Sequence, residues 1–182
     1  MGGFRALAPN INVNTASAQL RTELQNTFAR LDGTLTLAPY RVFVNVGPND
    51  NDGATETTLF QYTIEQGSLN QVGSSILINA AGKTAANGNN KTLKLVLGST
   101  EVFTSGALAL NNVDWTLKGE IIFLSGTSQM VYMEFQRNGG SPVITTNYAS
   151  ESFNANVAVK LRGLGTSSAD ISAWYWKGLF LK

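Results

Sequence analysis

Three glutamates in the strand-like part of the sequence are the residues that could perform hydrolysis. Cleavage of a glycosidic bond needs two carboxyl groups, one acting as acid and the other as base or nucleophile. Glu120, Glu134 and Glu151 carry such groups. They fall at outward positions on or beside predicted strands, and nothing in their spacing pairs them. We therefore predict that the chain has no catalytic residues and is not an enzyme.

Histidine and cysteine are both absent from the 182 residues. Without histidine the chain lacks the commonest general base and the commonest metal ligand. Without cysteine it has no disulfide, no thiolate nucleophile and no Cys-bound metal. This excludes Ser/His/Asp triads and zinc hydrolases, and we expect no cofactor.

The segment GPNDNDG at 47–53 invites comparison with a calcium-binding loop, because Asp50 and Asp52 precede Gly53. If that glycine is aligned with the glycine of an EF-hand loop, the first ligand position is Pro48 and the position of the bidentate glutamate is Leu59. Neither residue has a carboxylate. The segment is dense in turn-forming residues, so we predict a solvated turn and no metal.

The last run of the chain, ISAWYWKGLFLK, alternates in a way that predicts a strand with apolar residues on both faces. Trp174 and Trp176 are expected to share one face with Phe180. Such a strand lies in the core with a subunit against its back, or at a binding surface. The tryptophans therefore have two interpretations: they close a core or subunit interface, or they stack on the sugar rings of a host surface glycan.

The elements that would position these side chains are strands, and the clearest of them lie between Asn87 and Phe135. Apolar and polar residues alternate there between Gly/Asn/Ser clusters, which predicts an antiparallel sheet. Three inward rows are expected: Leu93, Leu95 and Leu97; Val113, Trp115, Leu117, Ile121 and Phe123; and Val131, Met133 and Phe135. Further strand faces are expected at Tyr40, Val42, Val44 and Val46, at Phe60, Tyr62 and Ile64, and over 153–161.

The number and spacing of these runs predict an all-β fold. About eight to ten strands after residue 39, separated by turn residues, are typical of an antiparallel β-sandwich. Periodicity cannot separate a jelly roll from an immunoglobulin-like sandwich. The strand count favours a jelly-roll-like fold, and the missing cysteine pair weakens an antibody-type domain.

A single helix is expected ahead of the strands. Asn14 or Thr15 can cap its first turn and Gly33 can end it, which predicts a helix over TASAQLRTELQNTFARLD. An isolated helix of this length is marginal in water, so it must pack against its own sandwich, against copies of itself or against a larger assembly. Its apolar stripe consists of Leu20, Leu24, Phe28 and Leu31.

Residues 1–14 are predicted to form an extended arm, because they combine two glycines, a proline and regularly spaced asparagines. Pro39 blocks continuation of a helix. We therefore expect an arm and an anchoring or oligomerisation helix over 1–38, and a β-sandwich domain over 39–182. Burial of apolar arm residues on a neighbour would order this segment, and those residues are Phe4, Leu7, Ile11 and Val13.

The charge of the chain is low and balanced. Charged residues make up 14% of the sequence, and 13 Lys+Arg against 12 Asp+Glu give a net charge of +1. The basic residues are scattered singly, which predicts neither a nucleic-acid partner nor an anionic membrane partner. The first residues lack the apolar run of a signal peptide, and surfaces rich in Asn, Thr, Ser and Gly are common in assemblies.

The segment from about Thr57 to Phe180 resembles the β-sandwich modules of tailed-bacteriophage virion proteins. The resemblance rests on TTLFQYTI, NAAGKTAANGNNKTLKLVLGSTEVF, SGALALNNVDWTLKGEI and SESFNANVAVKLRGLG. It implies a structural protein located in the virion, commonly a homotrimer, with an N-terminal anchor and an outward jelly roll. It transfers no functional residue, because these modules share no active-site motif.

Two functions follow from this resemblance and from the residues together. The first is a capsid decoration, cement or short fibre protein that contacts phage capsid or tail proteins through residues 1–38. The second is a tail-associated receptor- or carbohydrate-binding module that uses Trp174 and Trp176. The sequence leaves open whether the chain belongs to the capsid or to the tail.

Overall fold

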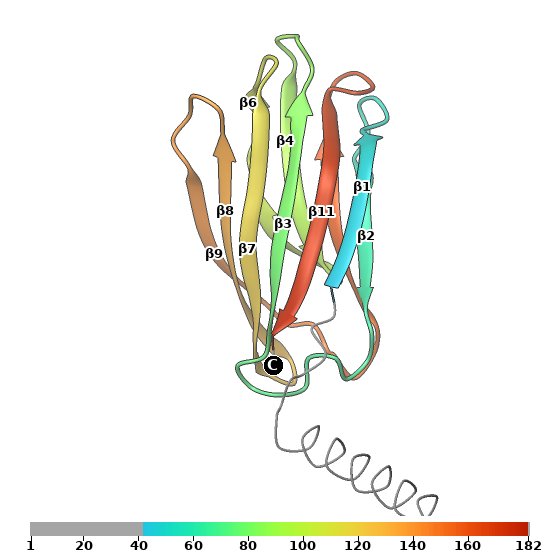
Figure 1. Cartoon of the computed structure of the whole chain (residues 1–182), viewed down its shortest axis with the longest axis vertical. Helices are drawn as coiled ribbons and strands as arrows, with labels where there is room; N and C mark the ends of the chain where they lie inside the picture. The colour runs from blue at the N-terminus through green and yellow to red at the C-terminus, as the bar shows by residue number, and fades with distance from the viewer. Residues whose placement is uncertain (1–41, 182) are drawn as a thin grey trace, which may run out of the picture. The chain divides into compact units, whose positions relative to one another are not determined.

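The computed structural model describes residues 42–181, which form two antiparallel sheets packed as a sandwich (Figure 1). The chain divides into the units Met1–Pro39 and Tyr40–Lys182, and the predicted arm and helix lie outside the described residues. The strands are β1 (Val42–Asp50), β2 (Thr57–Ile64), β3 (Ser75–Thr84), β4 (Asn90–Leu97), β5 (Thr100–Thr104), β6 (Leu108–Ala109), β7 (Asp114–Ser125), β8 (Ser128–Arg137), β9 (Val143–Ala149), β10 (Val157–Leu164) and β11 (Ile171–Leu181).

The strand order matches that of a jelly roll. One sheet runs β1-β11-β3-β7-β8-β9 and the other β2-β10-β4-β5, with the short β6 paired to β4. Without β6, β8 and β9, eight strands remain in two four-stranded sheets, and the chain crosses between the sheets as the two Greek keys of a jelly roll require. The prediction of an all-β antiparallel sandwich is confirmed. Within residues 42–181 no helix is long and apolar enough to span a membrane.

The hairpin formed by β8 and β9 widens one sheet beyond the jelly-roll set. It follows β7 directly and adds two strands at the edge of the sheet, so this sheet has six strands (Figure 1). Its inner side joins the core, because the rings of Phe135 and Phe103 lie 5.9 Å apart across the sandwich. The side-chain amide of Asn147 in β9 donates to the carbonyl of Val102 in β5 at 2.9 Å. The hairpin is therefore a packed part of the domain.

The core is built from the inward rows that alternation predicts. Successive strand side chains point to opposite faces, so one residue in two is buried. The three rows predicted between 87 and 135 are confirmed as buried, except that Val113 is half-buried at the start of its row. Phe60 and Ile64 are also buried, and Tyr62 packs against the core.

The valine face predicted for the first strand points away from the core. Val44 and Val46 are 51% and 77% exposed, whereas Phe43, which directly precedes Val44, is buried. The Phe43 ring stacks on Tyr62 of β2 with 4.0 Å between centroids. Burying one large aromatic ring removes more apolar surface from water than burying valines does, so Phe43 sets the register of this edge strand.

Candidate functional site

The two outer faces of the sandwich differ in their exposed apolar side chains. Among the described residues eight large apolar side chains are exposed; seven lie on strands of the six-stranded sheet and none on the five-stranded sheet. Large exposed apolar patches mark interaction surfaces. We call the outer side of β1, β11, β3, β7, β8 and β9 the six-strand face. Its exposed apolar residues are Val44, Val46, Leu124, Tyr132, Ile144, Tyr148 and Trp174.

The outer side of the other sheet, the five-strand face, carries a charged cluster instead. The Lys94 ammonium lies 2.9 Å from a carboxylate oxygen of Glu56 and 2.9 Å from one of Glu101. Arg162 pairs with the second oxygen of Glu56. Lys94 and Arg162 hold the pKa of Glu56 below its ordinary value, and the two carboxylates raise the pKa of Lys94. Exposed ion pairs stabilise a fold only slightly, so this cluster mainly keeps the five-strand face hydrophilic.

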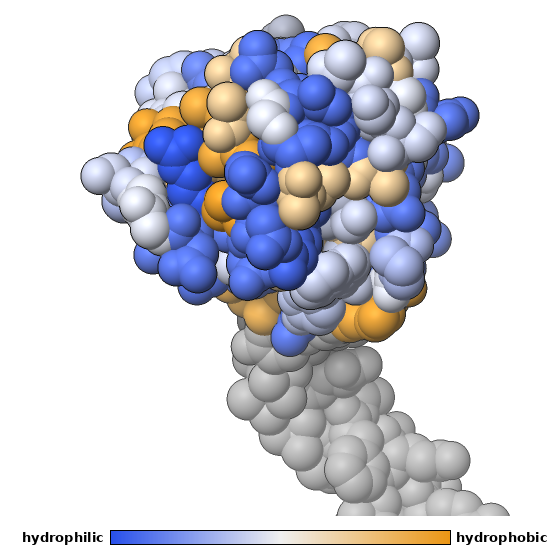
Figure 2. Space-filling view, turned by 90° about the horizontal axis from the view of Figure 1, so that it is seen from above, coloured by the Kyte–Doolittle hydropathy of each residue, from blue (hydrophilic) through white to orange (hydrophobic). Residues whose placement is uncertain are grey.

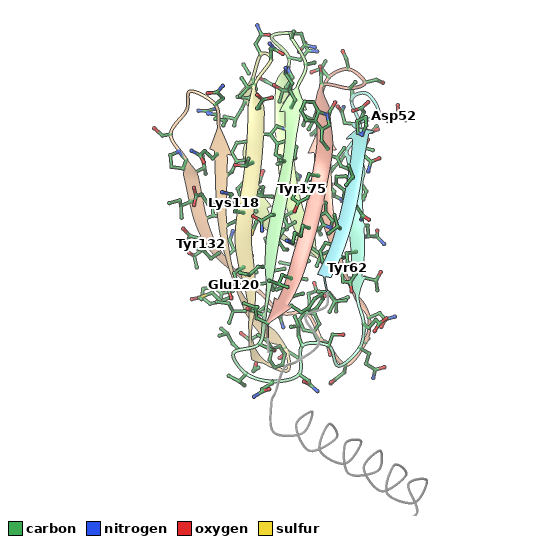
Figure 3. The ribbon with its side chains drawn as sticks, viewed as in Figure 1. Asp52, Tyr62, Lys118, Glu120, Tyr132 and Tyr175 are labelled. Carbon is green, nitrogen blue, oxygen red and sulfur yellow. The ribbon has the colours of Figure 1, made fainter. Side chains whose placement is uncertain are left out.

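The six-strand face is ordered in rows that run across all its strands. Cross-strand neighbours in an antiparallel sheet lie side by side on one face. Figure 3 looks onto this face and labels Lys118, Glu120, Tyr132 and Tyr175 on its strands. The central row consists of Val44, Lys177, Asn79, Lys118, Glu134 and Ile144, from β1 to β9. Apolar residues at both ends of this row therefore enclose charged and amide groups in its middle.

The two tryptophans that were expected to share a face point to opposite sides of β11. The register of β11 with β3 shifts between Ala173 and Tyr175, so Trp174 is an extra residue in a β-bulge. Alternation is reversed beyond the bulge: Trp176 is fully buried, whereas Trp174 is 45% exposed. The prediction of a shared face was wrong. Trp176 belongs to the core, and Trp174 is the tryptophan available to a glycan or a subunit.

A polar cavity of about 250 Å³ lies where β7 begins and β8 ends. One lining residue, Thr116, is the cross-strand neighbour of Ala81, which is the neighbour of Tyr175. Strands lie about 4.8 Å apart, so Tyr175 is roughly 10 Å from Thr116 with a small side chain between them. Hydroxyl, amide and charged groups of this kind can bind sugar hydroxyls. The cavity is lined by Asp114, Thr116, Gln136, Arg137 and Asn138.

The three glutamates considered for hydrolysis do not converge on this cavity. Glu120 accepts a hydrogen bond from the Ser75 hydroxyl, and Glu134 lies on the flat six-strand face opposite Lys118. Glu151 accepts from the backbone N–H of Ser99 at 2.8 Å. Burial alone would raise the pKa of Glu151, but hydrogen bonds from Ser99 and Thr100 outweigh burial and lower it. Its carboxylate therefore holds the turn between β4 and β5.

The segment compared with a calcium site, 47–53, is only partly a turn, because residues 47–50 are the end of β1 (Val42–Asp50) and the hydrogen-bonded turn follows them. The Asp52 backbone N–H donates to the Thr57 hydroxyl at 3.0 Å. Leu59, at the position of the missing ligand, is buried in the core. Among residues 42–181 no group of three or more acidic side chains is placed to hold a metal ion.

A buried polar cluster joins the β3–β4 loop to the β10–β11 loop at the end of the sandwich that Figure 2 views from above. Asp170 is fully buried, and its carboxylate accepts from the Asn87 amide at 2.7 Å and from the backbone N–H groups of Thr166 and Ser167 at 2.8 Å each. Burial would raise the pKa of Asp170, but these hydrogen bonds outweigh burial and lower it to about 2.

The ammonium of Lys91 compensates the buried charge of Asp170 through Asn87. Lys91 is 1% exposed, and its Nζ donates to the Asn87 side-chain oxygen at 2.6 Å, to the Asn87 carbonyl at 3.1 Å and to the Asn89 carbonyl at 3.0 Å. Sequence reasoning missed this cluster. The available signal was one lysine within the asparagine-rich turn at 87–92.

The residues predicted to dock on the virion or to form an oligomer lie outside the described part of the chain. They are Phe4, Leu7, Ile11, Val13, Leu20, Leu24, Phe28 and Leu31. Their role stays a prediction. The one-sided distribution of exposed apolar residues on the six-strand face was not predicted, because strand alternation by itself does not say which outward residues lie on one sheet.

No family model and no curated protein matches the chain. Among solved structures, it is similar to that of the infectious bursal disease virus Gt strain, with 17% identity, 79% of this chain and 33% of that chain covered, and a TM-score of 0.38. The VP2 subviral particle of that virus matches with 14% identity, the same coverages and a TM-score of 0.35. T=1 particles derived from it match with 15% identity, coverages of 79% and 32%, and a TM-score of 0.37.

The chain spans about a third of the length of these solved structures. Each TM-score is below 0.5, so these likenesses carry no argument about function.

Proposed function

We propose that this chain is a non-enzymatic structural protein of a virus particle. The observation that carries the proposal is the one-sided distribution of exposed apolar side chains, seven on the six-strand face and none on the five-stranded sheet. A protein that works alone gains nothing from exposing valine, isoleucine, tyrosine and tryptophan on one broad sheet. In an assembly, burial of the exposed part of each such side chain contributes about 25 cal/mol per Å² of apolar surface removed from water.

The sequence supports a more specific role within the particle. The resemblance of residues 57–180 to bacteriophage virion modules favours a homotrimeric capsid decoration, cement or short fibre protein. In this proposal residues 1–38 anchor the chain to capsid or tail proteins and the sandwich projects. Three linked copies multiply a weak anchor through avidity, which suits the short apolar stripe of Leu20, Leu24, Phe28 and Leu31.

Deletion of residues 1–33 tests the anchor. The truncated chain should stay soluble and folded, because the described core lies within 43–180, but it should no longer bind particles assembled from the genome that encodes it. Binding is measured as copies per purified particle by quantitative mass spectrometry. Hundreds of copies of the full chain would indicate capsid decoration, and a few to a few tens would indicate the tail or a vertex.

A matched pair of full-length variants removes the effect of the deletion itself. Leu24→Asp places a charge on the apolar stripe and should reduce the copy number as strongly as the deletion does. Gln25→Asp adds the same charge beside the stripe and should leave the copy number unchanged. Full occupancy by the truncated chain contradicts the anchor.

A second candidate function, glycan binding, is favoured by the exposed Trp174 beside Tyr175 and the polar cavity. Trp115 and Trp176 are buried, so Trp174 accounts for the solvent-accessible tryptophan fluorescence. If the surface binds sugar, host-cell polysaccharide should change this emission, and Trp174→Ala should abolish the response while Tyr148→Ala, an exposed aromatic elsewhere on the same sheet, keeps it. Emission that does not change with polysaccharide removes this candidate.

A further inference from the structure

We propose that the six-strand face binds the same face of a second copy, related by a two-fold axis that runs along the strands between β3 and β7. The inference rests on the proposed function, since it names the occupant of the surface on which that function is based. It pairs the cross-strand rows that contain Lys177, Leu179 and Leu181 with the same rows of the second copy.

The order of the strands gives the face a centre about which it can pair with itself. Three strands, β3, β11 and β1, lie on one side of the boundary between β3 and β7, and three, β7, β8 and β9, on the other. A half-turn about an axis parallel to the strands places β7 over β3, β8 over β11 and β9 over β1 of the partner copy. This rotation leaves the position of each residue along the strand direction unchanged. Each cross-strand row therefore faces the same row of the partner copy, with the strands in reverse order.

The central row is complementary to its own reverse. Lys177 of one copy meets Glu134 of the other, which places opposite charges together twice across the axis. At both ends Val44 meets Ile144, and these residues are 51% and 56% exposed in the single chain. Such a contact buries apolar side chains at both ends of the row and places two pairs of opposite charges between them, which favours this register over others.

The adjacent row, nearer the C-terminal end of β11, adds apolar contacts. Leu179 meets Tyr132, which is 40% exposed. In the same row Leu77 meets Glu120, a mismatch, but the Glu120 carboxylate already accepts a hydrogen bond from Ser75 of its own chain. In the next row Leu181 meets Met130. The rows on one side of the centre are therefore mostly apolar.

The size and charge of the chain permit this contact. At about 4.8 Å between strands and 3.3 Å per residue, six strands of about seven residues cover roughly 650 Å². Two copies would bury roughly 1,300 Å² in total, which falls within the range of specific interfaces. A net charge of +1 gives little repulsion between copies. Sheets also pack face to face with their strands aligned to within about 30°.

Charge reversal in the full-length chain tests the contact. Glu134→Lys and Lys177→Glu each bring like charges together twice per pair, and each should weaken the association at least about tenfold. The double variant E134K/K177E should recover it, and so should an equal mixture of the two single variants, because each then meets an opposite charge. Sedimentation analysis over a range of concentrations measures the doubling of mass, from one to two chains or from three to six.

Control variants distinguish a loss of the contact between copies from a loss of folding. Lys160→Glu makes the same charge change on β10 of the five-stranded sheet and should leave the association unchanged, and all variants should melt as the unmodified chain does. Three results overturn the inference. The first is that the unmodified chain does not associate to twice its mass, and the second is that the single variants associate as the unmodified chain does. The third is that E134K/K177E and the mixture of single variants are folded but both fail to associate. Recovery on mixing would support it, because neither a foreign partner nor the chain's own residues 1–41 can produce that recovery.

The outcome is distinguishable from failure of the proposed function. If the chain does not double in mass but still occupies particles, this inference falls and the structural role stands. If it neither doubles nor occupies particles, both fall. A three-fold contact through the predicted helix at 15–32 would use a different part of the chain, so the two symmetries are compatible in one assembly.

Discussion

Replacement of Trp176 by alanine is expected to lower the free energy of unfolding by about 3–5 kcal/mol, the usual cost of removing a large buried aromatic. Trp176 is fully buried, and its ring lies 5.7 Å from that of Phe43 and 6.4 Å from that of Phe60. It thus contacts the neighbouring strand β1 through Phe43 and the opposite sheet through Phe60 of β2. Urea unfolding followed by circular dichroism measures the change.

Trp174 provides the matched control, because it is the same residue type two positions away on the same strand. Trp174→Ala removes a side chain that is 45% exposed and should cost less than about 1 kcal/mol. Trp176→Phe should cost less than Trp176→Ala, since it keeps a ring and removes an indole N–H that has no hydrogen-bond partner. Equal losses for the two alanine variants would contradict the assignment of Trp176 to the core.

Replacement of Asp170 by asparagine is expected to lower the free energy of unfolding at pH 7 by about 2–4 kcal/mol. The pKa of Asp170 is lowered from 3.8 to about 2 in the folded chain, so the carboxylate stabilises the fold at every pH above its unfolded pKa. The amide also places a donor against the N–H groups of Thr166 and Ser167, which now donate to one carboxylate oxygen.

The lowered pKa of Asp170 also predicts how the free energy of unfolding depends on pH. A group whose pKa is lower in the folded state loses its stabilising effect as the pH falls through that lowered pKa. The advantage of the unmodified chain over Asp170→Asn should therefore shrink between about pH 5 and pH 2. Asp52→Asn changes an exposed residue in the neighbouring loop, so its free energy of unfolding should stay within about 0.5 kcal/mol of that of the unmodified chain at each pH. A constant advantage for Asp170 down to pH 2 would contradict the network.

The central strands could be predicted because their burial follows from local alternation. Leu93, Leu95 and Leu97, for example, are buried at 4%, 0% and 0% exposure, as the pattern between 87 and 135 requires. A strand with one inward face repeats every two residues. When one of the two alternating sets is strongly apolar, that set points into the core whichever strands pair with it.

The edge strand and the last strand could not be predicted in the same way. In β1 local alternation favours burial of Val44 and Val46, and the burial of Phe43 instead depends on its contact with Tyr62 across the sandwich. In β11 the bulge at Trp174 reverses the alternation. A bulge arises from pairing with neighbours far away in the sequence, so local periodicity does not reveal it.

Composition and alternation are local properties, so they were enough to exclude histidine and cysteine chemistry and to predict the β-sandwich that residues 42–181 form. Which outward residues lie side by side depends on the fold. It places Glu134 and Lys177, 43 positions apart in the sequence, in one row with Val44 and Ile144 at its ends. Strand order and register are set by long-range pairing, and they turn scattered outward residues into one docking surface.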